Sequence, residues 1–359
     1  MKKISSVIFL LTFLVFINCK NNAGEASASN SDENDQGNKF YQSVIKLGNG
    51  FLDVFTSFGE LVADVFGLKA DPKKSEVKTY FDNIAKKLEE TVTSLEKLLE
   101  DNNKADKADN GDKADKADKA DKADNGVESA VNKISGLIKK MMDAAKAAGA
   151  AATGGGGDAI AAVDAGGQAG AVAEENSVKG IAKGMKGIVE AAEELGVELK
   201  VVAAGAGAGA GNGDAGHLFG NDGANATAAH IEKATDAVSK VSGKQIIKAI
   251  VDSTDGAGQA PDAATSPIAA AIGANEAGAP FAAGGMTADD KIAAAIVLRG
   301  MAKDGKFAHA AAAGKAMKIA VESAVNKTVS ALTDLVRESV QKGLKTVADA
   351  IKAAGNTGS

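Results

Sequence analysis

The chain has little of what β-sandwiches and barrels are built from. Among its 359 residues there is no tryptophan, there are two tyrosines and four prolines, and aromatic residues make up 4%. Few aromatics and prolines beside abundant alanine and 42 glycines favour helices joined by glycine-rich segments. The sequence therefore predicts an all-α fold: a mostly helical, elongated bundle with long Gly/Ala-rich loops and at most a few short strands.

Cysteine and excess positive charge are also scarce. A single cysteine excludes an internal disulfide framework and a thiolate zinc cluster. The formal net charge is −6, and no basic block interrupts the mature part of the chain. Because nucleic acids and anionic membranes attract basic surfaces, we expect no nucleic-acid partner.

The first 18 residues read as a signal peptide. Two lysines precede an apolar run of 14 residues, Ile4 to Ile17, which is shorter than the ~20 residues of a membrane-spanning helix. The only cysteine follows in Phe16-Ile17-Asn18-Cys19, which looks like a loose bacterial lipobox, so Cys19 is the predicted lipid-attachment residue. Cleavage after Ala28 is the competing interpretation. Residues 19–38 lack apolar anchors and are typical of a flexible tether.

Residues 39–355 are expected to form one helical domain. Apolar residues at helical spacing predict helices over 47–68, 127–141, 178–189 and 231–250 (bent near Gly243). Residues 292–298 are apolar all round, which predicts a helix buried among others. Another helix is expected up to residue 99, with Asp71 as its N-cap and Pro72 at its first position. Thr287 and Asp290 resemble a capping box, a last helix is expected from Phe307 onward, and residues 197–201 alternate like a short strand. Variable loops are expected near 102–126, 149–176, 203–224 and 252–285.

Two segments inside this domain have unusual sequences. Residues 104–124 hold six copies of Lys-Ala-Asp, broken once, and without an apolar stripe they predict a solvated helix extension or a disordered loop. Gly180, Gly184 and Gly187 lie on one expected helix, where they would allow a neighbouring helix to come close.

A search for chemistry finds no convincing motif. Residues 211–216 match G-x-G-x-x-G, but further glycines at 220 and 223 break the helix that a pyrophosphate site needs. Residues 300–306 match G-x-x-x-x-G-K, but Phe307 replaces the Ser or Thr that would hold Mg²⁺. His217, His230 and His309 have no partner at helical spacing, so no metal site is predicted. We expect no catalytic residue, no cofactor and no enzyme activity.

Three segments carry a family resemblance: the lipobox ending at Cys19, residues 175–190, and above all residues 286–307, MTADDKIAAAIVLRGMAKDGKF. They resemble the variable large proteins (Vlp/Vmp) of relapsing-fever spirochaetes, and the last block is shared closely with the Vls-type surface lipoprotein of Lyme spirochaetes. The resemblance covers essentially the whole chain. The block 286–307 is the specific part of it, whereas the Gly/Ala segments carry no specificity.

The resemblance implies a palmitate-bearing lipoprotein anchored at Cys19 to the outer membrane and facing the host. It implies a helical fold with its terminal helices near the membrane, and a role in antigenic variation and evasion of host antibodies. Two other classes stay open: a helical adhesin or receptor for a host ligand, and a periplasm-facing enzyme or scaffold. Self-association also stays open.

Overall fold

The computed structural model describes residues 72–107, 117–155, 157–161, 167–201, 211–221, 226–282 and 285–357. The predicted leader, Cys19, the tether and the helix expected over 47–68 lie outside the described residues. In the part of the chain that is described, helices are the regular elements and strand pairing is limited to three isolated bridges. The predicted all-α class is confirmed.

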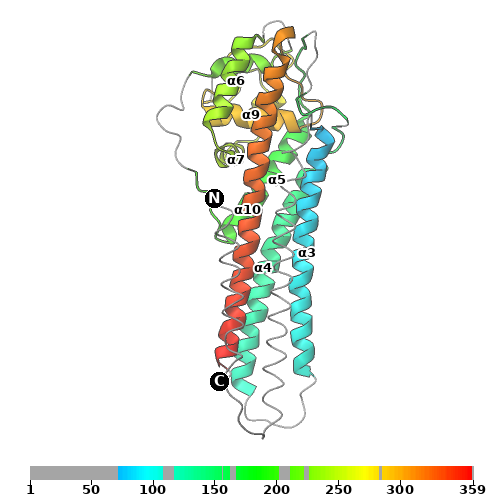
Figure 1. The fold of residues 1–359 in the computed structure, drawn as a ribbon, viewed down its shortest axis with the longest axis vertical. Coiled ribbons are helices and arrows are strands. Elements are labelled where there is room, and N and C mark those ends of the chain that lie inside the picture. The colour runs from blue at the N-terminus through cyan, green and yellow to red at the C-terminus, as the bar shows by residue number, and fades with distance from the viewer. Residues whose placement is uncertain are drawn as a thin grey trace, which may run out of the picture. The chain divides into compact units, whose positions relative to one another are not determined.

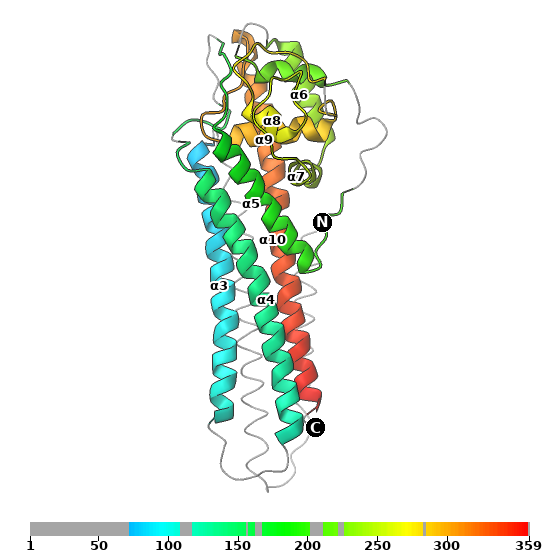
Figure 2. The same cartoon turned by 180° about the vertical axis from the view of Figure 1, so that it is seen from behind.

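Three long helices run side by side: α3 (Lys74–Lys107), α4 (Ala117–Ala151) and α10 (Gly314–Thr357) (Figure 1). A fourth, α5 (Glu175–Glu194), packs along α4 and reaches α10 (Figure 2). The apolar stripes that the sequence shows on these helices face one another, so that Leu88, Ile138, Ile188 and Leu335 are all completely or almost completely buried.

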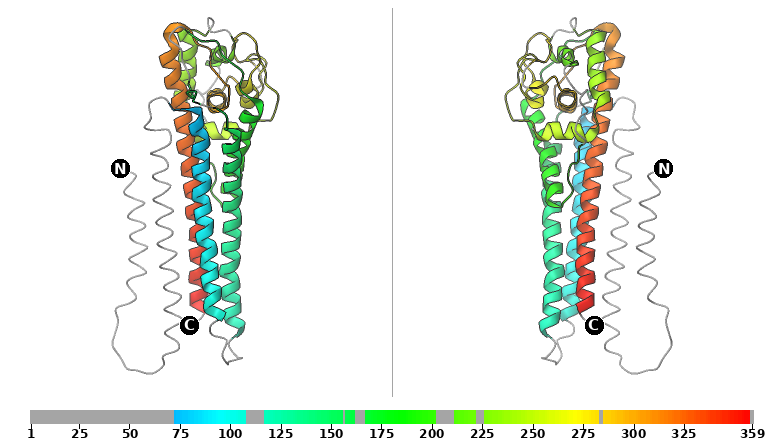
Figure 3. Two further views of the ribbon diagram at one scale, coloured as in Figure 1. Left: turned by 90° about the vertical axis from the view of Figure 1, so that its right-hand side faces the viewer. Right: turned by 90° about the vertical axis from the view of Figure 1, so that its left-hand side faces the viewer.

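Shorter helices gather around the first half of α10, at the end where α3 begins (Figure 3). They are the 3₁₀ helix η1 (Gly213–Phe219), α6 (Ala228–Lys240), α7 (Gly243–Val251), α8 (Pro267–Ile272), α9 (Asp289–Met301) and the 3₁₀ turn η3 (Ala311–Ala313). We call this group, with the segments that connect it, the head. Helix α9 lies inside it, in contact with α5, α6, α7, α8 and α10.

Several expected loops are partly helical. The Lys-Ala-Asp tract continues α3 as far as Lys107 and forms the start of α4 from Ala117, so the helix-extension alternative holds there and the loop expected over 102–126 is wrong for those residues. Segments 149–176, 203–224 and 252–285 contain the end of α4, η1 and α8 respectively. In η1 burial of Leu218 and Phe219 outweighs the glycine content, and in α8 the alanines themselves favour the helix that Ser266 caps.

Helices α3 and α10 begin later than predicted because the residues at the predicted start of each pair with another segment. Pro72 accepts a hydrogen bond from the Ile160 amide at 2.8 Å and lies before α3 rather than inside it. Likewise Lys306 bridges Ala171, and the chain enters α10 only at Gly314. A backbone N–H or C=O group that pairs with another segment is not available for the hydrogen bonds of a helix.

Three local predictions are wrong. The expected helix over 231–250 is two helices, because Ser242 accepts from the Gln245 amide and caps α7 separately. The predicted capping box at Thr287 is absent: α9 starts after Ala288, which makes no side-chain cap bond. Residues 197–201 form no strand, although Val197 and Leu199 point inward as their alternation predicts.

The three glycines of α5 lie against α4, as expected from their spacing. A Cβ atom at Gly184 would stand 2.4 Å from the Cβ of Ala148, and one at Gly180 would stand 2.3 Å from the Cβ of Ala151. Real atoms do not approach so closely, so these glycines set the distance between the two helices.

Candidate functional site: the enclosed helix α9 and its clamps

The central run of α9, Ile292 to Leu298, is apolar on every face, and the neighbouring helices enclose it completely. Each side chain from Ile292 to Leu298 has no exposed surface. Because a surface helix carries an apolar stripe on one side only, this pattern requires neighbours all round, and α5, α6, α7, α8 and α10 provide them. The prediction of a buried helix over 292–298 is confirmed.

One arginine ties α9 to two other elements of the head. The Arg299 guanidinium is fully buried and donates to the carbonyls of Ala271 (2.8 Å), Phe219 (2.9 Å), Ile272 (3.2 Å) and Ala270 (3.3 Å). Three of these carbonyls form the end of α8, where the helix dipole favours a cation. The guanidinium carbon also lies 4.7 Å from the centroid of the Phe219 ring.

Burial lowers the pKa of Arg299 to about 9, and because this value is still above 7 the side chain stays cationic at neutral pH. Gly273, the residue that follows α8, has no room for a side chain. Its φ is +78°, and a Cβ atom there would stand 2.0 Å from the Arg299 Nη2 atom. The guanidinium, the end of α8 and η1 therefore form one packed unit.

A buried lysine closes the C-terminal end of α9. Lys74, at the start of α3, is 1% exposed and donates from Nζ to the carbonyls of Ala302 (2.6 Å), Gly300 (2.8 Å) and Arg299 (3.2 Å). The three donors of an ammonium group match these three acceptors. Burial lowers the pKa of Lys74 to about 7, and the nearby Asp158 carboxylate opposes that shift.

A polar pair holds the other end of α9. The buried Asn212 side chain donates from Nδ2 to Oδ1 of Asp289, the first residue of α9, at 2.7 Å. Asn212 immediately precedes η1, and η1 ends at Phe219 under the Arg299 side chain. Residues far apart in the sequence thus clamp α9 at both ends.

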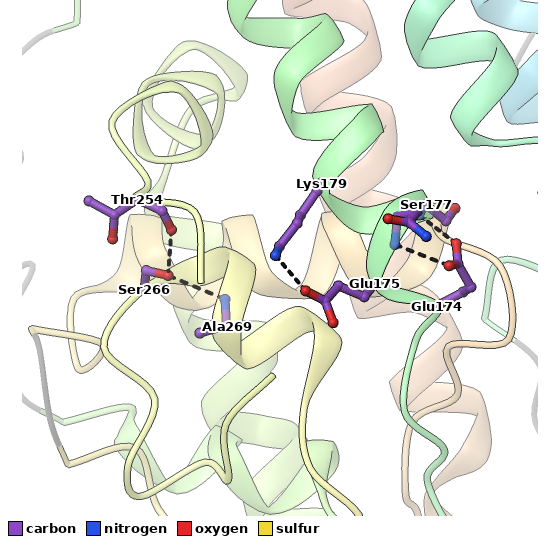
Figure 4. A network of polar contacts seen from close by, with 8 residues as sticks. Glu174, Glu175, Ser177, Lys179, Thr254, Ser266 and Ala269 are labelled. Carbon is purple, nitrogen blue, oxygen red and sulfur yellow. Dashed lines mark hydrogen bonds and ion pairs between the residues drawn. The ribbon is translucent and has the colours of Figure 1, made fainter. Parts of the chain in front are cut away.

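The ends of α5 and α8 are also fixed by side-chain caps (Figure 4). Glu174 accepts from the amides of Ser177 (2.6 Å) and Asn176 (3.1 Å) at the start of α5. Ser266 accepts from the Ala269 amide at the start of α8 and donates to the Thr254 carbonyl, both at 3.2 Å. These caps satisfy helix donors and hold the 253–266 segment on the head.

The two glycine motifs serve packing. A Cβ at Gly216 would stand 2.3 Å from the carbonyl oxygen of Ala279, and one at Gly305 would stand 2.6 Å from that of Arg299. Gly300 lies near the end of α9, and Phe307 is buried against the Phe219 ring at 5.5 Å. At both motifs the glycines allow other backbone segments to come close. This packing role accounts for the glycines without a phosphate-binding site.

The structure brings two of the three histidines together, against the prediction that they are isolated. The rings of His217 and His230 stack with centroids 4.0 Å apart and planes inclined by 9°, whereas His309 is buried elsewhere. The described residues contain no group of three His, Cys, Asp or Glu side chains suited to a metal ion. In the same part of the chain no helix is long and apolar enough to cross a membrane.

Sequence reasoning missed the clamp residues Lys74, Asn212, Asp289 and Arg299 as a group. One signal was present: the chain has only two arginines, and Arg299 directly follows the apolar run 292–298. A charged residue in such a helix is rare unless it is paired inside the fold. Nothing in the local sequence indicates the partners of Lys74, which are more than 220 residues away.

Taken together, the helical frame and its clamped inner helix define a protein of the all-α class. Residues 51–351 match the family model described as "Borrelia lipoprotein", and the chain belongs to that family. The resemblance to the variable large proteins is confirmed as well, and the family is one of variable surface lipoprotein antigens.

Similar proteins match along nearly the whole chain. Variable large protein 4 of Borrelia hermsii is 33% identical over 98% of this chain and 93% of its own length. Variable large protein 17 of the same organism is 34% identical, over 92% and 86% respectively. The crystal structure of the Lyme disease variable surface antigen VlsE of Borrelia burgdorferi is 47% identical, covers 88% of this chain and 99% of that chain, and has a TM-score of 0.69.

Proposed function

We propose that the chain is a lipid-anchored surface antigen of the outer membrane that mediates antigenic variation and evasion of host antibodies. One observation carries the proposal: the apolar helix α9 is enclosed and clamped, while the segments 252–265 and 275–282 expose mostly small and polar side chains. The names of the relatives, variable large proteins and a variable surface antigen, support the same conclusion.

The distribution of exposed residues fits a surface that varies on a constant frame. In the segments 252–265 and 275–282 the exposed positions carry alanine, threonine, proline, acidic or amide side chains, such as Asp255, Asp262 and Glu276. Substitutions at such positions change the free energy of unfolding by only about 0.5 kcal/mol. The surface seen by an antibody can therefore change while α9 and its clamps stay the same.

Cys19 is the residue proposed to carry the lipid. One acyl chain alone binds a membrane marginally, and stable anchoring takes several chains, as a lipoprotein cysteine provides. The proposed partners are the membrane, through Cys19, and host antibodies. The proposal includes no catalytic role, no cofactor and no nucleic-acid partner.

A helical adhesin or receptor for a host ligand is the alternative. Among the described residues the exposed large apolar side chains are Val172 and Ile319, which gives this alternative no specific support. Saturable binding of the purified protein to host cells or matrix would establish it.

The test is protease treatment of intact cells, followed by blotting with an antibody against α10. Loss of the signal in wild-type cells, with a periplasmic protein left intact as control, supports display on the surface. A Cys19→Ala variant should leave the membrane fraction, and a Lys20→Ala variant is the matched control that should stay in it. Protection of the protein until the outer membrane is broken would refute surface display.

A further inference from the structure

The stacked histidines join two elements of the head that cover α9. His217 lies in η1 and His230 in the first turn of α6, and both η1 and α6 contact α9. With centroids 4.0 Å apart and planes nearly parallel, each imidazole covers the face of the other. Ring nitrogen lone pairs lie in the ring planes, so two parallel rings do not converge on one metal ion.

The surroundings of both Nδ1 atoms favour uncharged imidazoles. Nδ1 of His230 accepts from the Thr227 amide at 3.3 Å and completes the cap of α6, which it does only without a proton. Nδ1 of His217 is buried without a hydrogen-bond partner among the described residues. A proton on either Nδ1 would therefore remove the α6 cap or create a buried donor without an acceptor.

The charged groups that act on His217 oppose one another. Burial and the neighbouring His230 of α6 lower the pKa of His217, while the Asp214 carboxylate of η1 itself and the nearby Gly278 backbone, from the segment that follows α8, raise it; the net direction is downward. A histidine with a lowered pKa in the folded state makes the fold less stable as the pH falls below its ordinary value of 6.5.

We propose that the His217–His230 stack is an acid-sensitive latch. At neutral pH the stack holds η1 against the start of α6, and protonation of the stack separates η1 from α6 and uncovers α9. The latch is independent of surface display and of the lipid anchor. It adds to a static scaffold a response to acidic surroundings, by which the enclosed helix becomes accessible.

The test is hydrogen exchange with mass spectrometry on the purified full chain at pH 7.5 and pH 5.0, corrected for the intrinsic pH dependence of exchange. One histidine whose folded form resists protonation raises the opening equilibrium up to about 30-fold at pH 5. We expect more than threefold faster exchange at pH 5.0 in peptides covering 213–219 and 228–240, with α4 unchanged. Equal protection at both pH values would overturn the proposal.

Two variants distinguish the latch from a general effect of acid. In His230→Gln the amide oxygen still accepts from Thr227 but does not titrate, and in His217→Phe a ring still stacks but does not titrate. Each should fold normally by circular dichroism at pH 7.5 and reduce the acceleration to less than threefold. The third histidine, His309, is unchanged in both variants and serves as the internal control. If the folded variants keep the full acid response, the response comes from groups other than His217 and His230, and the latch is refuted.

Discussion

Replacement of Arg299 by methionine tests whether the clamp on α9 holds the head together. The methionine keeps an apolar side chain but leaves the carbonyls of 270–272 and Phe219 without their charged donor. The Ile272 carbonyl keeps the Ala173 amide as a second donor at 3.0 Å, so the penalty falls on the other three carbonyls, those of Ala270, Ala271 and Phe219. At about 1–2 kcal/mol for each buried unpaired acceptor, we expect a loss of about 3–6 kcal/mol in unfolding free energy.

The second arginine of the chain provides the matched control. Arg337 forms an ion pair with Asp334 at 2.5 Å on a partly exposed face of α10, and exposed pairs contribute about 0–1 kcal/mol. Urea unfolding followed by circular dichroism should therefore separate Arg299→Met from Arg337→Met by at least about 2 kcal/mol. Equal midpoints and slopes for the two variants would refute the assignment of a clamp to Arg299.

Three further predictions concern burial, titration and packing. Antibodies raised against a peptide of residues 286–307 should bind the denatured protein much better than native cells, because α9 is enclosed; equal binding would contradict the burial. The pKa of Lys74 falls from 10.5 to about 7 on folding, so between these pH values the unfolded chain binds more protons and the folded state becomes more stable as the pH rises. Relative to Lys74→Met, the wild type should therefore gain about 2 kcal/mol of unfolding free energy from pH 7 to pH 9. Urea midpoints that change with pH by the same amount in both proteins would contradict this prediction. Gly184→Ala should lower the melting temperature because its Cβ meets Ala148, whereas Gly136→Ala in α4, with no atom within 4 Å, should raise it slightly by improving helix propensity; a similar effect of both would show that α5 does not pack closely on α4.

Helix periodicity carried most of what could be predicted about the fold. The apolar spacing in α3, α4, α5 and α10 identifies helices whose stripes are buried as expected, and the all-apolar run at 292–298 predicts an enclosed helix. These predictions succeed because burial follows a local period of 3.6 residues along one segment. The glycine spacing in α5 succeeds for the same reason.

Predictions failed where distant segments compete for the same backbone groups. Residues 72–74 pair with 158–160 and residues 306–309 with 168–171, and both pairings shorten a helix that the local pattern extends. The separation of α6 from α7 depends on the cap at Ser242, which the continuous apolar pattern hides. In each case a hydrogen bond with a specific partner outweighs the local propensity.

By itself, the sequence determined the helical class, the enclosed helix, the candidate lipid site at Cys19 and the family. These properties follow from composition, local periodicity and contiguous motifs. Only the tertiary structure decided the clamps at Lys74 and Arg299 and the stacking of His217 on His230. A buried charge or a paired ring depends on partners from other segments, and no local pattern contains the distance between them.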